Sequence, residues 1–91
     1  MIYFRQTIIN QIKLASNERE IEQVINDSLH RLKIKNVNGH IIQRFISSMG
    51  LALHRESIGK FSRKTLANMN FAINLFKKLQ KPLEPYEYGN D

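Results

Sequence analysis

Hydrophobic residues recur at helical spacing in four segments of the chain, which are separated by short polar or glycine-containing breaks. The first segment covers residues 3 to 14 and places Phe4 and Ile8 on one side, as in a helix. Its isoleucine and tyrosine content also suits a strand, so both alternatives stay open for its start. The second segment begins after Asn17, a good N-cap residue, with Glu20 three positions later as in a capping box. This punctuation predicts an amphipathic helix.

The third and fourth segments have wider apolar surfaces. The third runs from about His40 to Arg55, and the fourth runs from Ser62 to about Lys81, where Pro82 stops it. Apolar residues cover well over half of the circumference of the fourth helix, so several neighbouring helices have to bury it. We therefore expect the fourth helix to be central, with the third packed against it.

These patterns predict an all-α fold, a compact antiparallel bundle of about four helices. Residues 1 to 81 are expected to form a single helical domain, and residues 82 to 91, which contain proline and tyrosine, an extended C-terminal tail. Asn68 falls on the apolar arc of the fourth helix, so it must find a hydrogen-bond partner or mark a gap in the core. The predicted core comprises Ile8, Ile12, Ile21, Val24, Ile25, Leu29, Leu32, Ile42, Phe45, Ile46, Met49, Leu53, Leu66, Met69, Ile73, Phe76 and Leu79.

Composition argues against an enzyme. The chain has 91 residues and no cysteine, which excludes thiolate nucleophiles and thiolate metal ligands. The three histidines are far apart in sequence, no glycine-rich phosphate-binding motif occurs, and the paired glutamates at the start of the second helix are explained by its dipole. We therefore expect no catalytic site, no metal site and no cofactor.

The N-terminal segment lacks the features of a signal peptide, because polar residues interrupt it from Arg5 onward and no small-residue cleavage site follows. The longest uninterrupted apolar runs are three or four residues, far too short to span a membrane. From the sequence we expect a soluble, cytoplasmic protein without a membrane partner.

Positive charge is concentrated in the middle of the chain. Residues 1 to 27 carry three basic and four acidic side chains, whereas residues 28 to 83 carry eleven basic side chains against Glu56 alone, a net charge of +10. Residues 84 to 91 carry three acidic side chains and no basic one. Such segregation favours a negatively charged partner.

The start of the fourth helix concentrates this charge in an unusual place. Ser62 is a good N-cap, yet Lys60, Arg63 and Lys64 surround it, at the helix end where the dipole repels cations. Backbone donors, the dipole and cations together have the parts of an anion site, and the polar stripe of the same helix adds amides that can read base edges. The candidate anion-binding or nucleic-acid-binding residues are Lys60, Ser62, Arg63, Lys64, Asn70, Asn74, Lys77 and Lys81.

The third helix offers a second candidate surface. Leu51 falls on its polar face, where Arg44 and Arg55 also lie, and we take these three as candidate partner-binding residues. Small residues around Gly50 would allow another backbone to approach closely. The first hypothesis is a small non-enzymatic interaction module that presents a basic helical surface to an acidic protein partner, or to a second copy in a homodimer. The alternative is a nucleic-acid-binding protein that uses the fourth helix.

Overall fold

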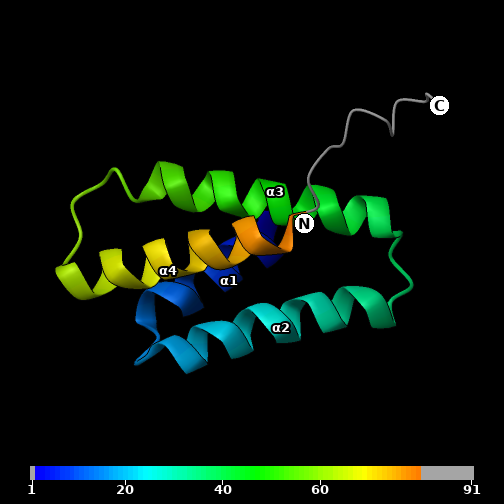
Figure 1. The fold of residues 1–91 in the computed structure, drawn as a ribbon, viewed down its shortest axis with the longest axis horizontal. Coiled ribbons are helices and arrows are strands. Elements are labelled where there is room, and N and C mark those ends of the chain that lie inside the picture. The colour runs from blue at the N-terminus through cyan, green and yellow to red at the C-terminus, as the bar shows by residue number, and fades with distance from the viewer. Residues whose placement is uncertain (1, 81–91) are drawn as a thin grey trace.

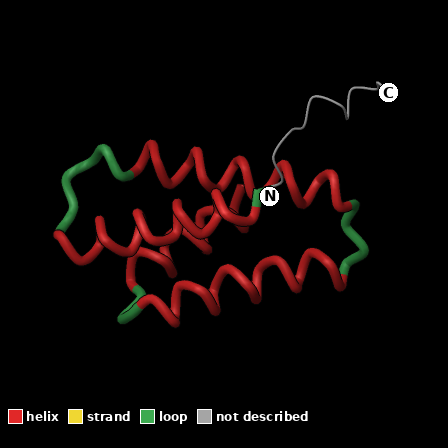
Figure 2. Tube along the Cα trace, in the orientation of Figure 1, coloured by secondary structure: helices red, strands yellow, loops and turns green. Residues whose placement is uncertain are grey.

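Four helices joined by short loops make up the part of the chain that the computed structural model describes, residues 2 to 80 (Figures 1 and 2). Their bounds are α1 Ile2–Leu14, α2 Glu18–Ile34, α3 Gly39–Glu56 and α4 Arg63–Leu79. No strand occurs within these residues, so the all-α prediction is confirmed and the strand alternative for the first segment is wrong. The predicted tail, with Pro82, lies outside the described residues.

Helix α4 is the central element, as its wide apolar surface predicts. It contacts α1, α2 and α3, and in Figure 1 it lies between α3 and α2 with α1 behind it. Helices α3 and α4 run antiparallel: the side-chain amide of Gln80 donates to the hydroxyl of Ser47 at 3.0 Å, and that of Gln43 donates to the carbonyl of Leu79 at 3.5 Å. The end of α4 therefore lies beside the first half of α3.

The core lies where α4 meets the other three helices. Twelve of the predicted core residues are buried, and Val24, Leu29, Ile42, Leu66 and Leu79 are instead partly buried against them. Of these five, Ile42 lies in the first turn of α3 and Leu79 is the last residue of α4. The buried core also includes Ile9, Ala15 and Ala72, which are absent from the predicted core.

Helix α2 has well-defined caps at both ends. The side chain of Asn17 accepts a hydrogen bond from the N–H of Glu20 at 2.9 Å, as predicted. The carboxylate of Glu20 accepts from the N–H of Ser16 at 2.8 Å, one residue further out than in a standard capping box. The chain then reverses at Asn36, which has a left-handed φ of 58° after the C-cap. Helix α3 starts immediately afterwards, with Asn38 as its N-cap.

Polar contacts tie α1 to α3 and to the loop that follows α3. Lys13 forms an ion pair with Glu56, and its ammonium lies 4.9 Å from the centre of the Phe61 ring. Arg5 donates a hydrogen bond to the hydroxyl of Ser48. These contacts hold α1 against α3 and the loop that follows it.

No helix in the described part of the chain combines the length and the hydropathy needed to cross a membrane.

Candidate functional site

The start of α4 is capped as the sequence predicts. The hydroxyl oxygen of Ser62 accepts a hydrogen bond from the N–H of Thr65 at 3.2 Å, and the two hydroxyl groups lie 3.1 Å apart. Lys60, Arg63 and Lys64 are all exposed there. The conflict between these cations and the helix dipole is therefore present in the folded protein.

Part of this conflict has a structural explanation. The Lys64 ammonium donates a hydrogen bond to the carbonyl of Ser16, in the loop after α1. One turn further along α4, the side-chain amide of buried Asn68 donates to the carbonyls of Ala15 at 2.9 Å and Lys13 at 3.3 Å. A helix leaves its last carbonyls without intrahelical partners, and α4 supplies donors to those of α1. Lys64 thus helps to connect α4 to the loop after α1, whereas Lys60 and Arg63 are exposed to solvent.

The remaining candidates on α4 form one exposed stripe. Arg63, Asn70, Asn74 and Lys77 are exposed, and their spacing of seven, four and three residues puts them on the same side of the helix. At 1.5 Å of rise per residue, the stripe is about 21 Å long. Lys81, the last predicted member, lies outside the described residues.

A second stripe follows α3. Arg44, Leu51 and Arg55 are all exposed, and their spacing of seven and four residues again places them on one side. The Leu51 side chain is 62% exposed, so the prediction that it lies away from the core is confirmed. Because α3 and α4 pack side by side and antiparallel, Arg55 lies toward the end of the bundle where α4 starts, and Arg44 toward the end where α4 stops.

A hollow of about 280 Å³ lies between the two helices, and one residue of each stripe lines it. Leu51 from α3 and Lys77 from α4, predicted for two different functions, both line it. Phe76, which is only 1% exposed, also borders it and belongs to the core. We call this feature the α3–α4 hollow, and its lining comprises Ser47, Gly50, Leu51, His54, Ile73, Phe76, Lys77 and Gln80.

Among the described residues of α3 and α4, the surface around the hollow is cationic and carries no unpaired carboxylate. Among residues 39 to 80 the one acidic side chain is Glu56, and it is paired with Lys13 of α1. We call the outward surface that holds the hollow and both stripes the α3–α4 face; its charged and polar stripe residues are Arg44, Arg55, Arg63, Asn70, Asn74 and Lys77. This face therefore presents positive charge that no acidic group of the same two helices neutralises.

Several residues of the hollow could not be assigned to it from sequence. Ile73 and Phe76 follow the pattern of core residues, and nothing in that pattern tells that one edge of each borders a surface depression. The small residues Ser47 and Gly50 gave the only signal, because they predict a place where something can approach α3 closely. A Cβ atom added at Gly50 would lie 4.0 Å from the Cβ of Phe76, an ordinary contact, so α4 itself does not require the glycine.

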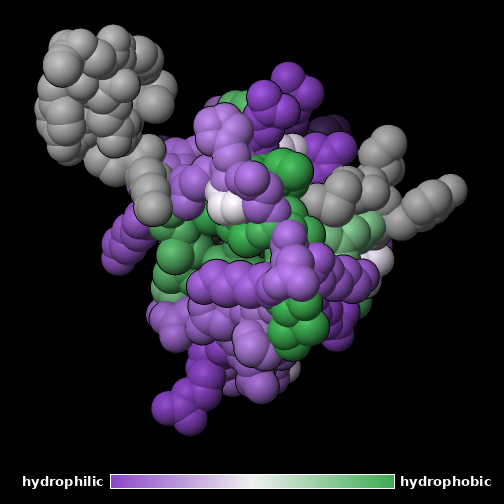
Figure 3. Space-filling view, turned by 90° about the vertical axis from the view of Figure 1, so that its right-hand side faces the viewer, coloured by the Kyte–Doolittle hydropathy of each residue, from purple (hydrophilic) through white to green (hydrophobic). Residues whose placement is uncertain are grey.

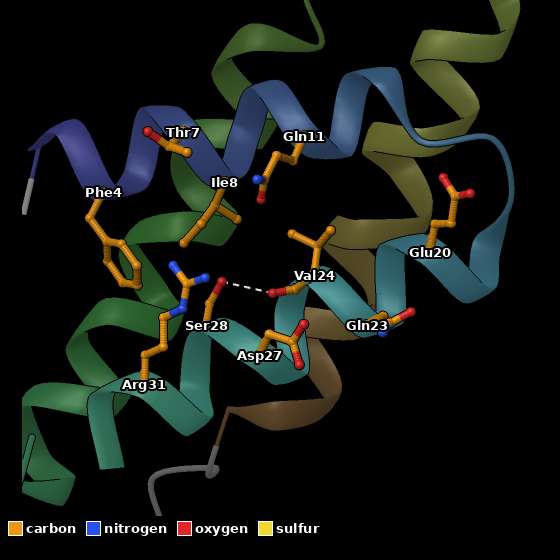
Figure 4. A pocket seen from close by; sticks show the side chains of 10 residues that line it. All are labelled: Phe4, Thr7, Ile8, Gln11, Glu20, Gln23, Val24, Asp27, Ser28 and Arg31. Atoms are coloured by element: carbon orange, nitrogen blue, oxygen red, sulfur yellow. Dashed lines mark hydrogen bonds between the residues drawn. The ribbon is translucent and has the colours of Figure 1, made fainter. Parts of the chain in front are cut away.

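A second hollow, of about 360 Å³, lies between α1 and α2 (Figure 4). Its charged residues have both signs: Glu20 and Asp27 lie on the same helix as Arg31. Glu20 already accepts the hydrogen bond of Ser16, and Ser28, which is buried, donates its hydroxyl to the carbonyl of Val24 at 2.7 Å. Because its charges have both signs and two of its polar groups already have partners in or next to α2, this hollow is a weaker candidate than the α3–α4 hollow.

Other apolar side chains are exposed singly. Figure 3 looks onto the end of the bundle where α2 ends and α3 begins, and it shows hydrophobic surface broken up by hydrophilic side chains. Ile34 and Ile41 are exposed near the α2–α3 connection, Ile58 follows α3, and Leu14 ends α1. Scattered exposed residues are normal on a protein surface. Leu51 differs from these four because it lines the α3–α4 hollow.

Within residues 2 to 80, no three histidine, aspartate or glutamate side chains gather in a way that could hold a metal ion. Comparison of the chain with protein-family models, with curated proteins and with solved structures finds no significant match.

Proposed function

We propose that this protein is a non-enzymatic interaction module that binds an acidic protein partner through the α3–α4 face. The observation that carries the proposal is the charge of this face: cations follow both helices, and the single carboxylate of residues 39 to 80 is paired with Lys13 on another helix. Unpaired cations of one sign on one surface attract a partner of opposite sign and steer its approach.

A symmetric homodimer through this face is disfavoured on the same grounds. An isologous interface places the same patch of two copies against itself. Arg44, Arg55 and Lys77 of one copy would then face the same cations of the other, and like charges across an interface oppose association. A different, acidic chain is therefore the better partner.

Nucleic acid is the second candidate, and the exposed line of Arg63, Asn70, Asn74 and Lys77 supports it. Cations at this spacing suit phosphates, and the two amides suit base edges. However, α4 is flanked by α3 and α2 (Figure 1), whereas a helix that enters the major groove must protrude from its domain. The packing of α4 therefore favours the protein partner.

Fluorescence anisotropy can decide between the two candidates. Labelled polyglutamate and labelled mixed-sequence DNA and RNA are titrated with the protein at low and at moderate salt. We expect polyglutamate to bind, and Lys77→Glu and Arg44→Glu to weaken this binding. Arg19→Glu is the matched control, because it makes an equal change of charge at an exposed residue of α2. It should have a much smaller effect on the affinity.

Tighter binding of nucleic acid than of polyglutamate, with a steep loss of affinity as salt rises, would favour the second candidate. In that case Arg63→Ala combined with Lys64→Ala should flatten the salt dependence. Equal effects of Lys77→Glu and Arg19→Glu would mean that net charge alone, and not the α3–α4 face, determines binding.

A further inference from the structure

The α3–α4 hollow gives the α3–α4 face an apolar centre, and this narrows the kind of partner. Leu51 forms an exposed apolar rim, while Ile73 and Phe76 contribute apolar surface from α4. At about 280 Å³ the hollow is slightly smaller than typical small-ligand pockets, which suits one or two side chains of a partner. Lys77 and His54 add polar groups at its border.

A larger residue than glycine would fit at position 50, so the packing of α3 against α4 does not by itself explain the hollow. Glycine weakens a helix interior relative to alanine. An added Cβ at Gly50 would meet nothing closer than the Cβ of Phe76, at 4.0 Å, so the contact between α3 and α4 does not demand glycine. A methyl group there would, however, take up space in the hollow that Gly50 lines. The glycine thus keeps the hollow open at the expense of helix stability.

The backbone around the hollow decides the conformation of the occupant. Both walls are helices, whose interior backbone groups are already hydrogen-bonded within each helix. They offer no sheet edge to an extended peptide, whose own N–H and C=O groups would then stay without protein partners. A helix satisfies its backbone internally and can lay an apolar stripe into a groove between two helices.

We infer that the α3–α4 hollow is the docking groove for an acidic amphipathic helix of the partner, which inserts an apolar side chain beside Leu51 and places its carboxylates against Arg44, Arg55 and Lys77. This inference rests on the proposed function and specifies its partner. Charge selects an acidic partner, and the hollow selects one with apolar anchors at helical spacing. A chain that is only acidic lacks the second feature.

The test uses two labelled helical peptides of about 15 residues, long enough to form helix in the groove. The first carries glutamate on one face and leucine on the other, and the second has glutamine in place of each leucine, so the two have the same charge. We expect the leucine peptide to bind the full-length protein about tenfold more tightly, as a buried apolar anchor provides. Amide chemical shifts should change at Gly50, Leu51 and Lys77.

Two variants locate the binding site. Leu51→Ala removes the apolar rim and should lower the affinity for the leucine peptide about fivefold or more. The affinity for the glutamine peptide should hardly change. Gly50→Ala should weaken binding of the leucine peptide as well. Because alanine favours the helix, this loss of affinity cannot come from unfolding. Ile58→Ala is the matched control, since Ile58 is 78% exposed and lies outside the hollow; it should leave the affinity unchanged.

The outcomes separate the inference from the proposed function. If both peptides bind equally and Leu51→Ala changes neither, the docking groove is wrong while an acidic partner remains supported. If neither peptide binds, the acidic partner and the docking groove both fall. If sedimentation shows a dimer that Leu51→Ala dissociates, the occupant is a second copy, and the inference of a partner helix is overturned.

Discussion

The side-chain amide of Asn68 donates a 2.9 Å hydrogen bond to the main-chain carbonyl of Ala15. Asn68 is 5% exposed and lies on the apolar side of α4, and its amide also reaches the carbonyl of Lys13 at 3.3 Å. Lys13 lies in the last turn of α1 and Ala15 directly follows the helix, where carbonyls have no partner within the helix. The polar residue on the apolar arc is therefore a joint between the central helix and α1.

Replacing this joint should destabilise the fold. We expect Asn68→Leu to lower the free energy of unfolding by about 1–3 kcal/mol, because two carbonyls lose their donor while leucine offers none. Asn70→Leu is the control on the same helix, since Asn70 is exposed, and it should change stability by less than about 0.5 kcal/mol. Urea unfolding measures both. Equal effects at the two positions would show that the hydrogen bonds of Asn68 contribute little.

Alanine should raise stability at Gly50. We expect Gly50→Ala to add about 0.5–1 kcal/mol, because alanine favours the helix interior and its Cβ would make only an ordinary contact at 4.0 Å from Phe76. Gly59→Ala is the contrasting variant, since its Cβ would lie 3.0 Å from the Phe61 ring and 3.3 Å from the carbonyl of Glu56. That change should destabilise the protein. Thermal unfolding compares the two, and a loss of stability in Gly50→Ala would contradict the argument.

The turn after α2 depends on the left-handed backbone of Asn36. The N–H of Asn36 donates to the carbonyl of Lys33 at 3.0 Å, and the N–H of Val37 donates to that of Leu32 at 3.1 Å, which is the Schellman pattern. We expect Asn36→Gly to keep or raise stability and Asn36→Ala to lower it by about 1 kcal/mol, because alanine tolerates a φ of 58° poorly. Denaturant midpoints test this order. The reverse order would mean that the side chain of Asn36 stabilises the turn in another way.

The sequence predicted the parts of the fold that neighbours along the chain determine. Asn17 and Ser62 cap helices because their side chains reach a backbone N–H three residues on, and the broad apolar surface of α4 predicted its central place. The partners of Asn68 could not be predicted, since they depend on how α1 and α4 rotate and slide against each other. The spacing of residues along one helix does not determine how two helices are placed against each other.

The same limit applies to the candidate site. The exposed positions of Leu51 and Lys77 follow from the helical period, so each could be chosen as a surface residue. Their meeting at one hollow depends on the antiparallel pairing of α3 and α4 and on the offset between them, which the contact of Gln80 with Ser47 records. The sequence therefore suggested two separate surfaces, whereas the structure brings one residue of each to the same hollow.

The ion pair between Lys13 and Glu56 should contribute measurably to stability. Their side chains are only 20% and 30% exposed, so water screens the pair less than it would at an open surface. A double-mutant cycle with Lys13→Met and Glu56→Gln should give a coupling energy of about 1 kcal/mol that decreases in high salt. A coupling energy near zero would show that this ion pair adds little to the stability of the fold.

The cations at the start of α4 should differ in their effect on stability, although Arg63 and Lys64 are adjacent and both exposed. Arg63→Met should raise stability by about 0.3–1 kcal/mol, because it removes a charge that the helix dipole repels. Lys64→Met removes a similar repulsion but also the hydrogen bond to the carbonyl of Ser16, worth about 0.5–1.5 kcal/mol, so the two effects should largely cancel. Urea unfolding at low and high salt tests this difference. The gain in Arg63→Met should shrink as salt screens the dipole, whereas equal gains in both variants would show that the bond of Lys64 to Ser16 does not stabilise the fold.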